Sequence, residues 1–303
     1  MTKLKSKLES ILGKDRIKKN FNLSPYLTLR TETTAEYYLE AETRQDLINA
    51  KKISLKLKLP LFILGGGSNL AILKKKLTGL VVRNKYIDKK IKKKNGNILL
   101  TISSGYPVSK LAKELADQGY EGLEYNYGLP GTIGGALYMN SKWIKPLSYT
   151  GDNLISANLV GKKGKIKVVD RSYFKFSYDQ SILQKTKEIL LEAVFKLKKT
   201  APQITKQHTD FAMKYRKQTQ PFGVFTSGCF FKNINGKSAG KLIDQTGLKG
   251  KRVGKFHVSD KHANFIIHDG NGNPADLEKL LQLIKAEVKK QFGVKLEEEV
   301  IVI

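Results

Sequence analysis

Cys229 is the only cysteine in this chain of 303 residues, and it lies in the segment "FTSGCFFKN", residues 225–233. A single thiol in such a segment has three possible roles: a small apolar core residue, a redox or metal-binding thiol, or a proton donor in a ligand cleft. A thiol with the ordinary pKa of about 8.5 is mostly protonated at neutral pH, so it can donate a proton. One cysteine excludes an internal disulfide and any metal site built from several cysteines.

Two glycine-rich segments are candidates for binding phosphate. The first, "GGGSN", follows the apolar run "LFIL", and the second, "GLPGTIGGA", precedes an expected helix. Backbone amides that no side chain covers can donate hydrogen bonds to a phosphate there. A structural turn would explain the first segment alone, and the second has the spacing of neither a Walker loop nor a dinucleotide fingerprint. Together they predict one long phosphate-bearing ligand held from two sides. The candidate residues are Gly65, Gly66, Gly67, Ser68, Asn69, Gly131, Thr132, Gly134 and Gly135.

Carboxylates near the C-terminus are candidates for proton transfer. The segment "LEEEVIVI" carries Glu297, Glu298 and Glu299. On a strand, alternation places Glu297 and Glu299 on one face and Glu298 on the other. A carboxylate that faces a cleft can deliver or steady a proton. The four histidines are too few and too unevenly spaced to predict a metal site, and His262 fits a core or strand-end position better than a cleft.

The charge of the chain is strongly positive, at +28 from 55 Lys and Arg against 27 Asp and Glu. The lysines occur all along the sequence, with little arginine and no interleaved aromatic residues. This pattern favours solvated lysine faces over a nucleic-acid-binding surface, although such a field attracts small phosphate-bearing ligands. No segment resembles a signal peptide or a membrane span. We therefore expect a cytoplasmic protein without a nucleic-acid or membrane partner.

The pattern of elements predicts an α+β fold. A β-α-β unit, with a helix from about Thr43, ends in the strand "LFIL". Two strands joined by an "NGN" turn at residues 95–97, a helix, and a hairpin around "KKGK" at residues 162–165 follow. Residues 200–221 are polar and contain two prolines, so we place a domain boundary near residue 200. The last hundred residues predict a strand ("VFTSGCFFKN"), a helix, further strands, a long helix and a final strand.

Taken in order, six segments resemble the UDP-N-acetylenolpyruvoylglucosamine reductase (MurB) family. They are "LGGGSNL", "GLEYNYGLPGTIGGALYMN", "SGCFFKN", "AGKLIDQTGLKGKRVG", "VSDKHANFIIH" and "LEEEV". The short stretch between Ser181 and Arg216 resembles the compact subtype of that family. The resemblance implies a two-lobed FAD-binding domain of the vanillyl-alcohol-oxidase (PCMH) type, with lobes at residues 1–84 and 85–200. It also implies a C-terminal α+β substrate-binding domain at residues 201–303.

The resemblance also implies a function and residue roles. The family uses NADPH and FAD to convert the enolpyruvyl ether of UDP-N-acetylglucosamine into UDP-N-acetylmuramate for peptidoglycan synthesis. The two glycine loops would hold the FAD pyrophosphate, Cys229 would be the proton donor, and Glu299 would be the catalytic glutamate. Tyr178, Lys232 and Asn233 would face the UDP-sugar. We expect a monomer without a metal; the alternatives are another oxidoreductase of this flavin fold and a catalytically impaired binding homologue.

Three segments depart from the family pattern. The motif Tyr-Arg-x-Ser reads Tyr178, Asp179, Gln180 and Ser181, so an aspartate replaces the arginine expected to stabilise the enolate. An early Gly-Gly pair is Glu32 and Thr33, and the turn after Met139 reads "NSKWIKPLSY". A negative charge at position 179 opposes an anionic intermediate. We expect either that a neighbour such as Arg216 or Lys217 compensates or that the protein is slower or altered in substrate.

Overall fold

The computed structural model describes residues 3–94 and 96–303, and the chain folds as two compact units. The first unit comprises Met1–Lys19, Tyr37–Gly66 and Thr78–Tyr215. The second comprises Asn20–Glu36, Gly67–Leu77 and Arg216–Ile303. The three-part division at residues 84 and 200 stays a prediction. Two of the hydrophobic cores are centred in the first unit and one in the second.

The N-terminal part carries the predicted β-α-β unit. Its elements are α1 (Lys3–Leu12), β1 (Lys18–Asn22), η1 (Ser24–Tyr26), β2 (Thr34–Ala41), α2 (Arg44–Leu57), β3 (Leu61–Leu64) and β5 (Lys76–Asn84). Helix α2 begins as predicted, because Thr43 and Asp46 form a reciprocal capping box. Strand β3, the "LFIL" run, pairs in parallel with β5, and Leu61 lies opposite Leu80. The first glycine loop therefore leaves the end of a strand fixed in a sheet.

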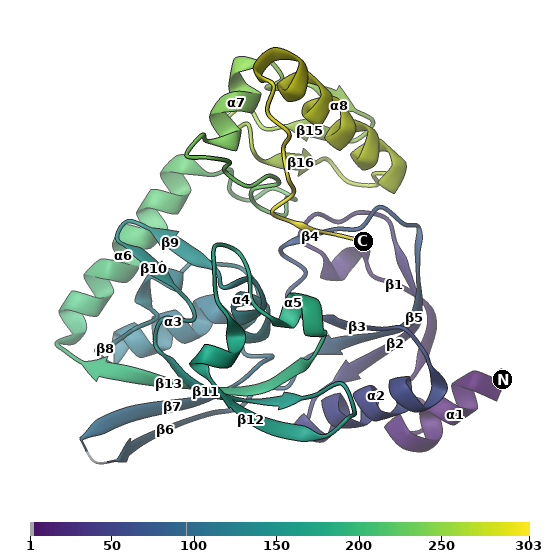
Figure 1. Cartoon of the computed structure of the whole chain (residues 1–303), viewed down its shortest axis with the longest axis vertical. Helices are drawn as coiled ribbons and strands as arrows, with labels where there is room; N and C mark the ends of the chain where they lie inside the picture. The colour runs from purple at the N-terminus through teal and green to yellow at the C-terminus, as the bar shows by residue number, and fades with distance from the viewer. Residues whose placement is uncertain (1–2, 95) are drawn as a thin grey trace. The chain divides into compact units, whose positions relative to one another are not determined.

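The following part is built on a second sheet. Its elements are β6 (Lys89–Lys94), β7 (Asn97–Ser103), α3 (Val108–Asp117), β8 (Tyr120–Glu121), η2 (Glu124–Asn126), α4 (Ile133–Met139), β9 (Lys142–Ile144), β10 (Leu147–Tyr149), β11 (Leu154–Val160), β12 (Ile166–Asp170), η3 (Arg171–Phe174), α5 (Leu183–Thr186) and β13 (Ile189–Lys199). The strand order is β12-β11-β13-β7-β6, and β8 pairs with β13 (Figure 1). The hairpin predicted around "KKGK" is confirmed as β11 and β12. The predicted "NGN" turn includes Asn95, which lies outside the described residues.

Helices α3 and α4 share one core with this sheet. Leu111 of α3 and Leu137 of α4 are fully buried, in the same cluster as Leu100 of β7 and Phe195 of β13. Helix α4 is short, and its apolar side chains fix the glycine loop that precedes it. The sheet thus positions the second glycine-rich segment.

A helix occupies the polar stretch beside the predicted domain boundary. Helix α6 runs from Pro202 to Thr219, an element that the sequence pattern does not predict. Its buried stripe consists of Thr205, Thr209, Ala212 and Arg216, at the i, i+4, i+7, i+11 spacing of one helix face. Polar side chains can be buried in this stripe because their hydroxyl groups bond to backbone carbonyls. Thr205, for example, donates to the carbonyl of Ala116 at 2.6 Å. A search for apolar periodicity does not detect such a helix.

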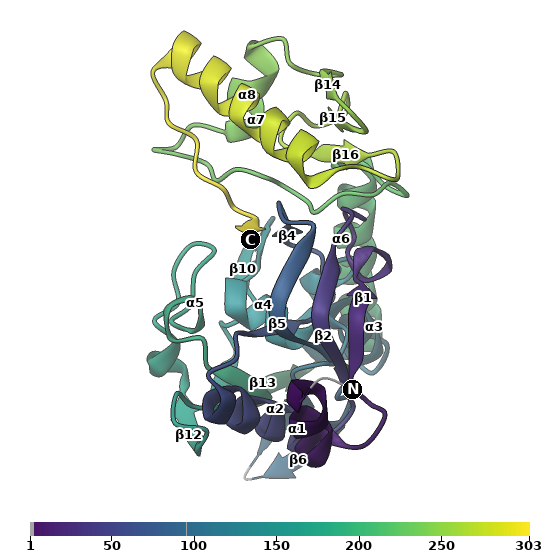
Figure 2. The same cartoon turned by 90° about the vertical axis from the view of Figure 1, so that its right-hand side faces the viewer.

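The second unit is an α+β body. Besides the short elements near the start of the chain, it contains β4 (Leu70–Ala71), α7 (Ala239–Gln245), β14 (Arg252–Val253), β15 (Phe256–Val258), β16 (Ile266–His268), α8 (Pro274–Phe292) and β17 (Ile301–Val302). Helix α8 lies beside α7 and the β14-β15-β16 sheet (Figure 2). Phe230, Phe231 and Phe256 are buried in its core with Leu277 and Ile284 of α8. Within the described residues, no helix combines the length and hydropathy needed to cross a bilayer.

Candidate active site

The two glycine-rich loops touch each other. A methyl group on Gly66 would lie 2.5 Å from the Cα of Gly131, and one on Gly65 would lie 2.7 Å from the Oγ1 of Thr132. Real side chains do not approach backbone this closely, so this contact needs glycine at position 66. The prediction that both loops act on one ligand gains a geometric basis, since they form a single bare backbone surface.

Backbone amides of the two loops differ in their availability. The N–H groups of Ile133 and Gly134 donate to the carbonyls of Tyr106 and Ser104, at 2.9 and 2.8 Å. That of Gly135 donates to the Oγ1 of Thr132, the N-cap of α4. Among the hydrogen bonds of the described residues, none uses the amide of Gly65, Gly66, Gly131 or Thr132 as donor.

These four amides belong to residues at the contact between the loops, and such uncovered backbone donors suit a pyrophosphate. Gly134 and Gly135 shape the loop instead, because their amides are already bonded within the protein. A cofactor-binding role for the loops therefore stays a prediction, with its donors now restricted to Gly65, Gly66, Gly131 and Thr132.

Gly66→Ala is expected to lower FAD affinity at least about tenfold, because the new methyl group forces the two loops apart. The readout is the flavin absorbance retained by the purified protein, followed by titration with added FAD. Gly135→Ala is the folding comparison, since its nearest neighbour would be Thr132 Oγ1 at 3.7 Å and its melting temperature should stay near that of the parent. A Gly66→Ala protein that purifies with the parent flavin content would contradict the assignment.

Cys229 and Glu299 lie on adjacent segments of the second unit. Cys229 forms an isolated antiparallel bridge with Phe265, and the N–H of Glu299 donates to the carbonyl of Phe230 at 2.8 Å. The neighbouring side chains of Phe230 and Phe231 are buried at 0% and 1% exposure, whereas Cys229 is half-buried. The two aromatic rings therefore anchor the segment, and Cys229 is not needed as its core residue.

The segment around Cys229 is not the regular strand that we predicted. Its bridges run from Phe225 to His268, from Cys229 to Phe265 and from Phe231 to Glu298. The prediction of a regular strand is wrong because these are isolated bridges: Phe225 and Cys229 pair with residues 265–268, whereas Phe231 pairs with Glu298 near the C-terminus. Such a segment can present one side chain between two structured neighbours.

Asn264 holds this segment with both ends of its side chain. It accepts a hydrogen bond from the N–H of Phe231 at 2.9 Å and donates to the carbonyl of Phe231 at 2.8 Å. Its own carbonyl accepts from the N–H of Phe230. Because Asn264 is buried at 3% exposure, these bonds are shielded from water and fix the backbone directly after Cys229.

Asn69 of the first loop contacts the Glu299 segment within the second unit, and Gly67 lies against Tyr26. The side-chain amide of Asn69 donates to the carbonyl of Glu299 at 3.4 Å, and the N–H of Ile301 donates to the carbonyl of Asn69 at 3.0 Å. Gly67 has a φ of +64°, and a methyl group on it would lie 2.3 Å from the carbonyl oxygen of Tyr26. The "GGGSN" loop thus contributes Gly65 and Gly66 to one unit and Gly67, Ser68 and Asn69 to the other.

Two of the three glutamates in "LEEEV" have an exposed position or an ion pair that explains them without a catalytic role. Glu297 is exposed, while its carbonyl accepts from the N–H of Lys232 at 2.9 Å. Glu298 forms an ion pair with Lys285 of α8. Glu299, half-buried beside the Cys229 segment, stays the candidate for proton transfer.

Lys232 and Asn233 continue the Cys229 segment. Lys232 is half-buried, and the side-chain oxygen of Asn233 accepts from the N–H of Ala239 at 3.1 Å, at the start of α7. That bond fixes the amide of Asn233. Their assignment to the UDP-sugar stays a prediction. His262 is a structural residue, because its Nδ1 accepts from the N–H of Asn264, and burial holds its pKa below the ordinary value.

Asp179, the unexpected acid, is paired with a residue that sequence analysis did not identify. The Nζ of Lys142 lies 2.8 Å from its carboxylate, and the side chains of Lys142 and Asp179 are 17% and 5% exposed. The same ammonium group lies 3.5 Å from the centre of the Tyr178 ring. Lys142 belongs to "NSKWIKPLSY", which had been singled out only as a departure from a family pattern.

The cations proposed to compensate for Asp179 lie on α6. Arg216 is 6% exposed, and desolvation by burial lowers the pKa of its guanidinium to about 10. The carbonyl of Lys217 accepts from Lys261 at 2.6 Å. Instead, the cation that forms an ion pair with the Asp179 carboxylate is Lys142.

Comparison with known proteins gives matches over both parts of the chain. A UDP-N-acetylenolpyruvoylglucosamine reductase of Protochlamydia amoebophila is 38% identical over 266 residues, covering 88% of this chain and 87% of the relative. The chain belongs to the UDP-N-acetylenolpyruvoylglucosamine reductase family. The reductase of Synechocystis is 34% identical over 92% of this chain, and that of Clostridium novyi is 32% identical over 98%.

Two family models match separate parts of the chain. Residues 35–170 match the FAD binding domain, and residues 220–303 match the C-terminal domain of the reductase family. Among solved structures, the UDP-N-acetylenolpyruvylglucosamine reductase of Thermus caldophilus aligns with a TM-score of 0.81 and 29% identity, over 95% of this chain and 98% of that chain. These findings confirm the family, the α+β fold with a flavin-binding domain, and FAD as cofactor.

Proposed function

We propose that this chain reduces the enolpyruvyl ether of UDP-N-acetylglucosamine to UDP-N-acetylmuramate, using NADPH and FAD, for peptidoglycan synthesis. The observation that carries the proposal is the backbone bond from Glu299 to Phe230, which places the segments of Cys229 and Glu299 side by side although they are far apart in the sequence. A proton donor and a carboxylate at one place suit a reaction that ends in proton transfer to carbon. Family membership supplies the substrate class.

The residues of the first unit fit the cofactor. The amides of Gly65, Gly66, Gly131 and Thr132 would hold the pyrophosphate of FAD on the bare surface where the loops meet. FAD, when bound, supplies the hydride chemistry, from NADPH to C3 of the enolpyruvyl group. The chain provides binding, orientation and the proton.

The proton step belongs to the second unit. Addition of a hydride to C3 leaves an electron pair at C2, conjugated with the carboxylate as an enolate. The Sγ–H of Cys229 would give its proton to C2, forming the new C–H bond, and Glu299 would assist that transfer. Tyr178, Lys232 and Asn233 would hold the UDP-sugar.

The test is NADPH oxidation by the purified protein, measured with and without the enolpyruvyl substrate. We expect a yellow protein with a flavin spectrum and substrate-dependent NADPH consumption that produces UDP-N-acetylmuramate. Flavin reduction by NADPH without substrate turnover would favour another oxidoreductase of this fold. A flavin-binding protein that NADPH does not reduce would favour an impaired homologue, and a colourless protein that takes up no FAD would exclude both enzyme hypotheses.

The remaining expectations concern location and assembly. We propose a cytoplasmic monomer whose partners are small molecules rather than nucleic acids. The proposed substrate is itself a nucleotide sugar, and the positive charge of +28 attracts such an anion.

A further inference from the structure

Lys142 and Asp179 form a buried ion pair in a rigid setting. Asp179 has a φ of +51°, a left-handed conformation that is uncommon outside glycine and that aspartate tolerates better than most residues. Its segment is tied to the C-terminal end of α4: Ser181 donates to the carbonyl of Tyr138 at 2.7 Å, and Asn140 donates to the carbonyl of Ser177 at 3.1 Å. The carboxylate of Asp179 therefore has a fixed position.

The same helix connects the pair with the predicted cofactor loop. Helix α4 begins directly after Thr132, and Asn140 ends it in a left-handed conformation two residues before Lys142. Lys142 starts strand β9, whose pairing with β10 places Lys142 opposite Tyr149. Both backbones that carry the ion pair are thus anchored to the element that shapes the glycine loop.

A buried ion pair needs an explanation beyond stability. Removing two charges from water costs about as much as their attraction returns, so apolar residues of similar size stabilise a fold equally well or better. Here the lysine also lies over the Tyr178 ring, which is itself a candidate for substrate binding.

We propose that Lys142 is the cation that contacts the carboxylate of the enolpyruvyl group and stabilises the enolate formed from it. Asp179 is the positioning residue that holds the ammonium group over Tyr178. The proposal rests on the proposed function, because it assumes an enolpyruvyl substrate. Since the pair is neutral overall, Lys142 acts as a directed hydrogen-bond donor rather than through net charge, and its effect is confined to the half-reaction that involves the substrate.

The test separates the two half-reactions by stopped-flow absorbance of the flavin. In Lys142→Met, reduction by NADPH should stay within about threefold of the parent, and reoxidation by the enolpyruvyl substrate should slow at least about tenfold. Lys142→Arg should retain most of the rate, because its guanidinium keeps a charged hydrogen-bond donor at this position. The double variant that combines Lys142→Met with Asp179→Asn leaves no unpaired charge and suits the left-handed backbone, so it should fold and still show the slow reoxidation.

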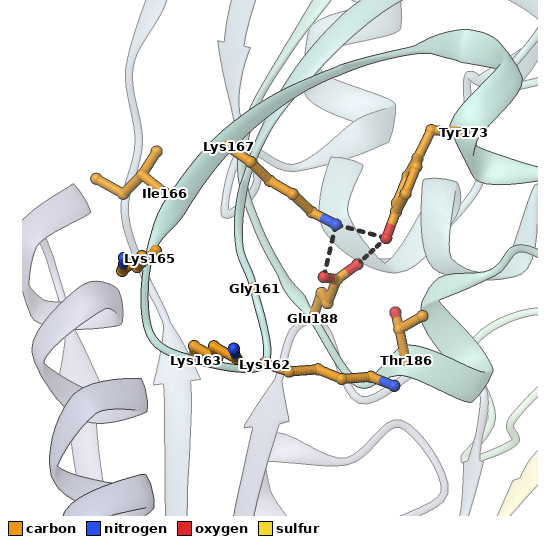
Figure 3. Close-up of a pocket in the computed structure, with 9 residues that line it drawn as sticks. All are labelled: Gly161, Lys162, Lys163, Lys165, Ile166, Lys167, Tyr173, Thr186 and Glu188. Carbon is orange, nitrogen blue, oxygen red and sulfur yellow. Dashed lines mark hydrogen bonds and ion pairs between the residues drawn. The ribbon is translucent and has the colours of Figure 1, made fainter.

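A matched control exists in the same unit. Lys167 lies 2.8 Å from Glu188, whose side chain is 4% exposed, and 4.0 Å from the centre of the Tyr173 ring. Figure 3 shows these three side chains converging beside the β11–β12 hairpin, in a pocket that none of the candidate site residues lines. Lys167→Met should lower the melting temperature and leave both half-reactions near the parent rates.

The outcomes distinguish this proposal from the proposed function. If the parent protein turns over the substrate and the double variant, Lys142→Met with Asp179→Asn, does so at the parent rate, Lys142 is structural and the proposal is wrong. Equal slowing of both half-reactions in Lys142→Met would also overturn it, because a general disturbance would then explain the loss. If the parent itself shows no substrate-dependent reoxidation, the proposed function fails instead.

Discussion

Cys229→Ala is expected to slow reoxidation of the flavin by the enolpyruvyl substrate by about a hundredfold or more, the usual contribution of a general acid. Reduction of the flavin by NADPH should stay near the parent rate, since no proton from Cys229 is needed in that half. Cys229→Ser should restore much of the loss, because a hydroxyl can occupy the same position and donate a proton. Stopped-flow absorbance of the flavin measures the two halves separately.

The structure makes this experiment interpretable. Phe230 and Phe231, rather than Cys229, fill the core behind the segment, and Asn264 fixes its backbone, so alanine at position 229 should leave the fold intact. Ser227→Ala is the control: Ser227 is 1% exposed and donates to the carbonyl of Leu70 at 2.7 Å, so its loss should lower stability without selecting one half-reaction. A Cys229→Ala protein that is reoxidised at the parent rate, with a lower melting temperature, would mean that the thiol is a packing residue.

Features that depend on short-range sequence signals were predictable. The helix start near Thr43, the strand "LFIL" and the hairpin around "KKGK" each depend on residues a few positions apart. The glycine loops were also recognisable, because only a backbone without side chains permits the approach of Gly66 to Gly131. What the pattern did not show was which amides are used within the protein, since that depends on the carbonyls of Ser104 and Tyr106.

The sequence pattern missed one helix and predicted one strand that the structure does not contain. Helix α6 was missed because the residues on its buried face are mainly polar, and their hydroxyl groups are satisfied by backbone carbonyls that the sequence does not reveal. The segment around Cys229 was predicted as a strand because its aromatic residues favour one, yet its isolated bridges change partner from residues 265–268 to Glu298. In both cases tertiary partners outweighed the local pattern.

The pairings that define the candidate site were beyond local patterns. Cys229 and Glu299 were associated only through a family resemblance, and the backbone bond from Glu299 to Phe230 now gives that association a physical basis. Lys142 and Asp179 were each noticed as departures, but nothing in their spacing indicated that they meet. Long-range pairs follow from how α4 and the segment after Ser177 are tied together, which is a property of the folded chain.

Asp179→Arg is expected to slow substrate reduction at least about tenfold, even though it recreates the Tyr-Arg-x-Ser pattern of the family. The new guanidinium would take the place of a carboxylate that lies 2.8 Å from Lys142. Two like charges about 4 Å apart repel by roughly 4 kcal/mol at an effective dielectric constant of about 20. The expected readouts are a lower melting temperature and slow reoxidation by the substrate, with NADPH-driven reduction less affected.

Combining Asp179→Arg with Lys142→Ser should recover much of that loss, because it removes the repulsion and leaves one cation beside Tyr178. The two substitutions are therefore expected to be strongly non-additive, as contacting residues usually are. An Asp179→Arg protein that reduces the substrate tenfold faster than the parent, equivalent to about 1.4 kcal/mol of transition-state stabilisation, would show instead that Asp179 is a defect. It would also show that Lys142 does not stabilise the enolate. If the Lys142 ammonium group already did so, a guanidinium group beside it at position 179 would give no gain in rate.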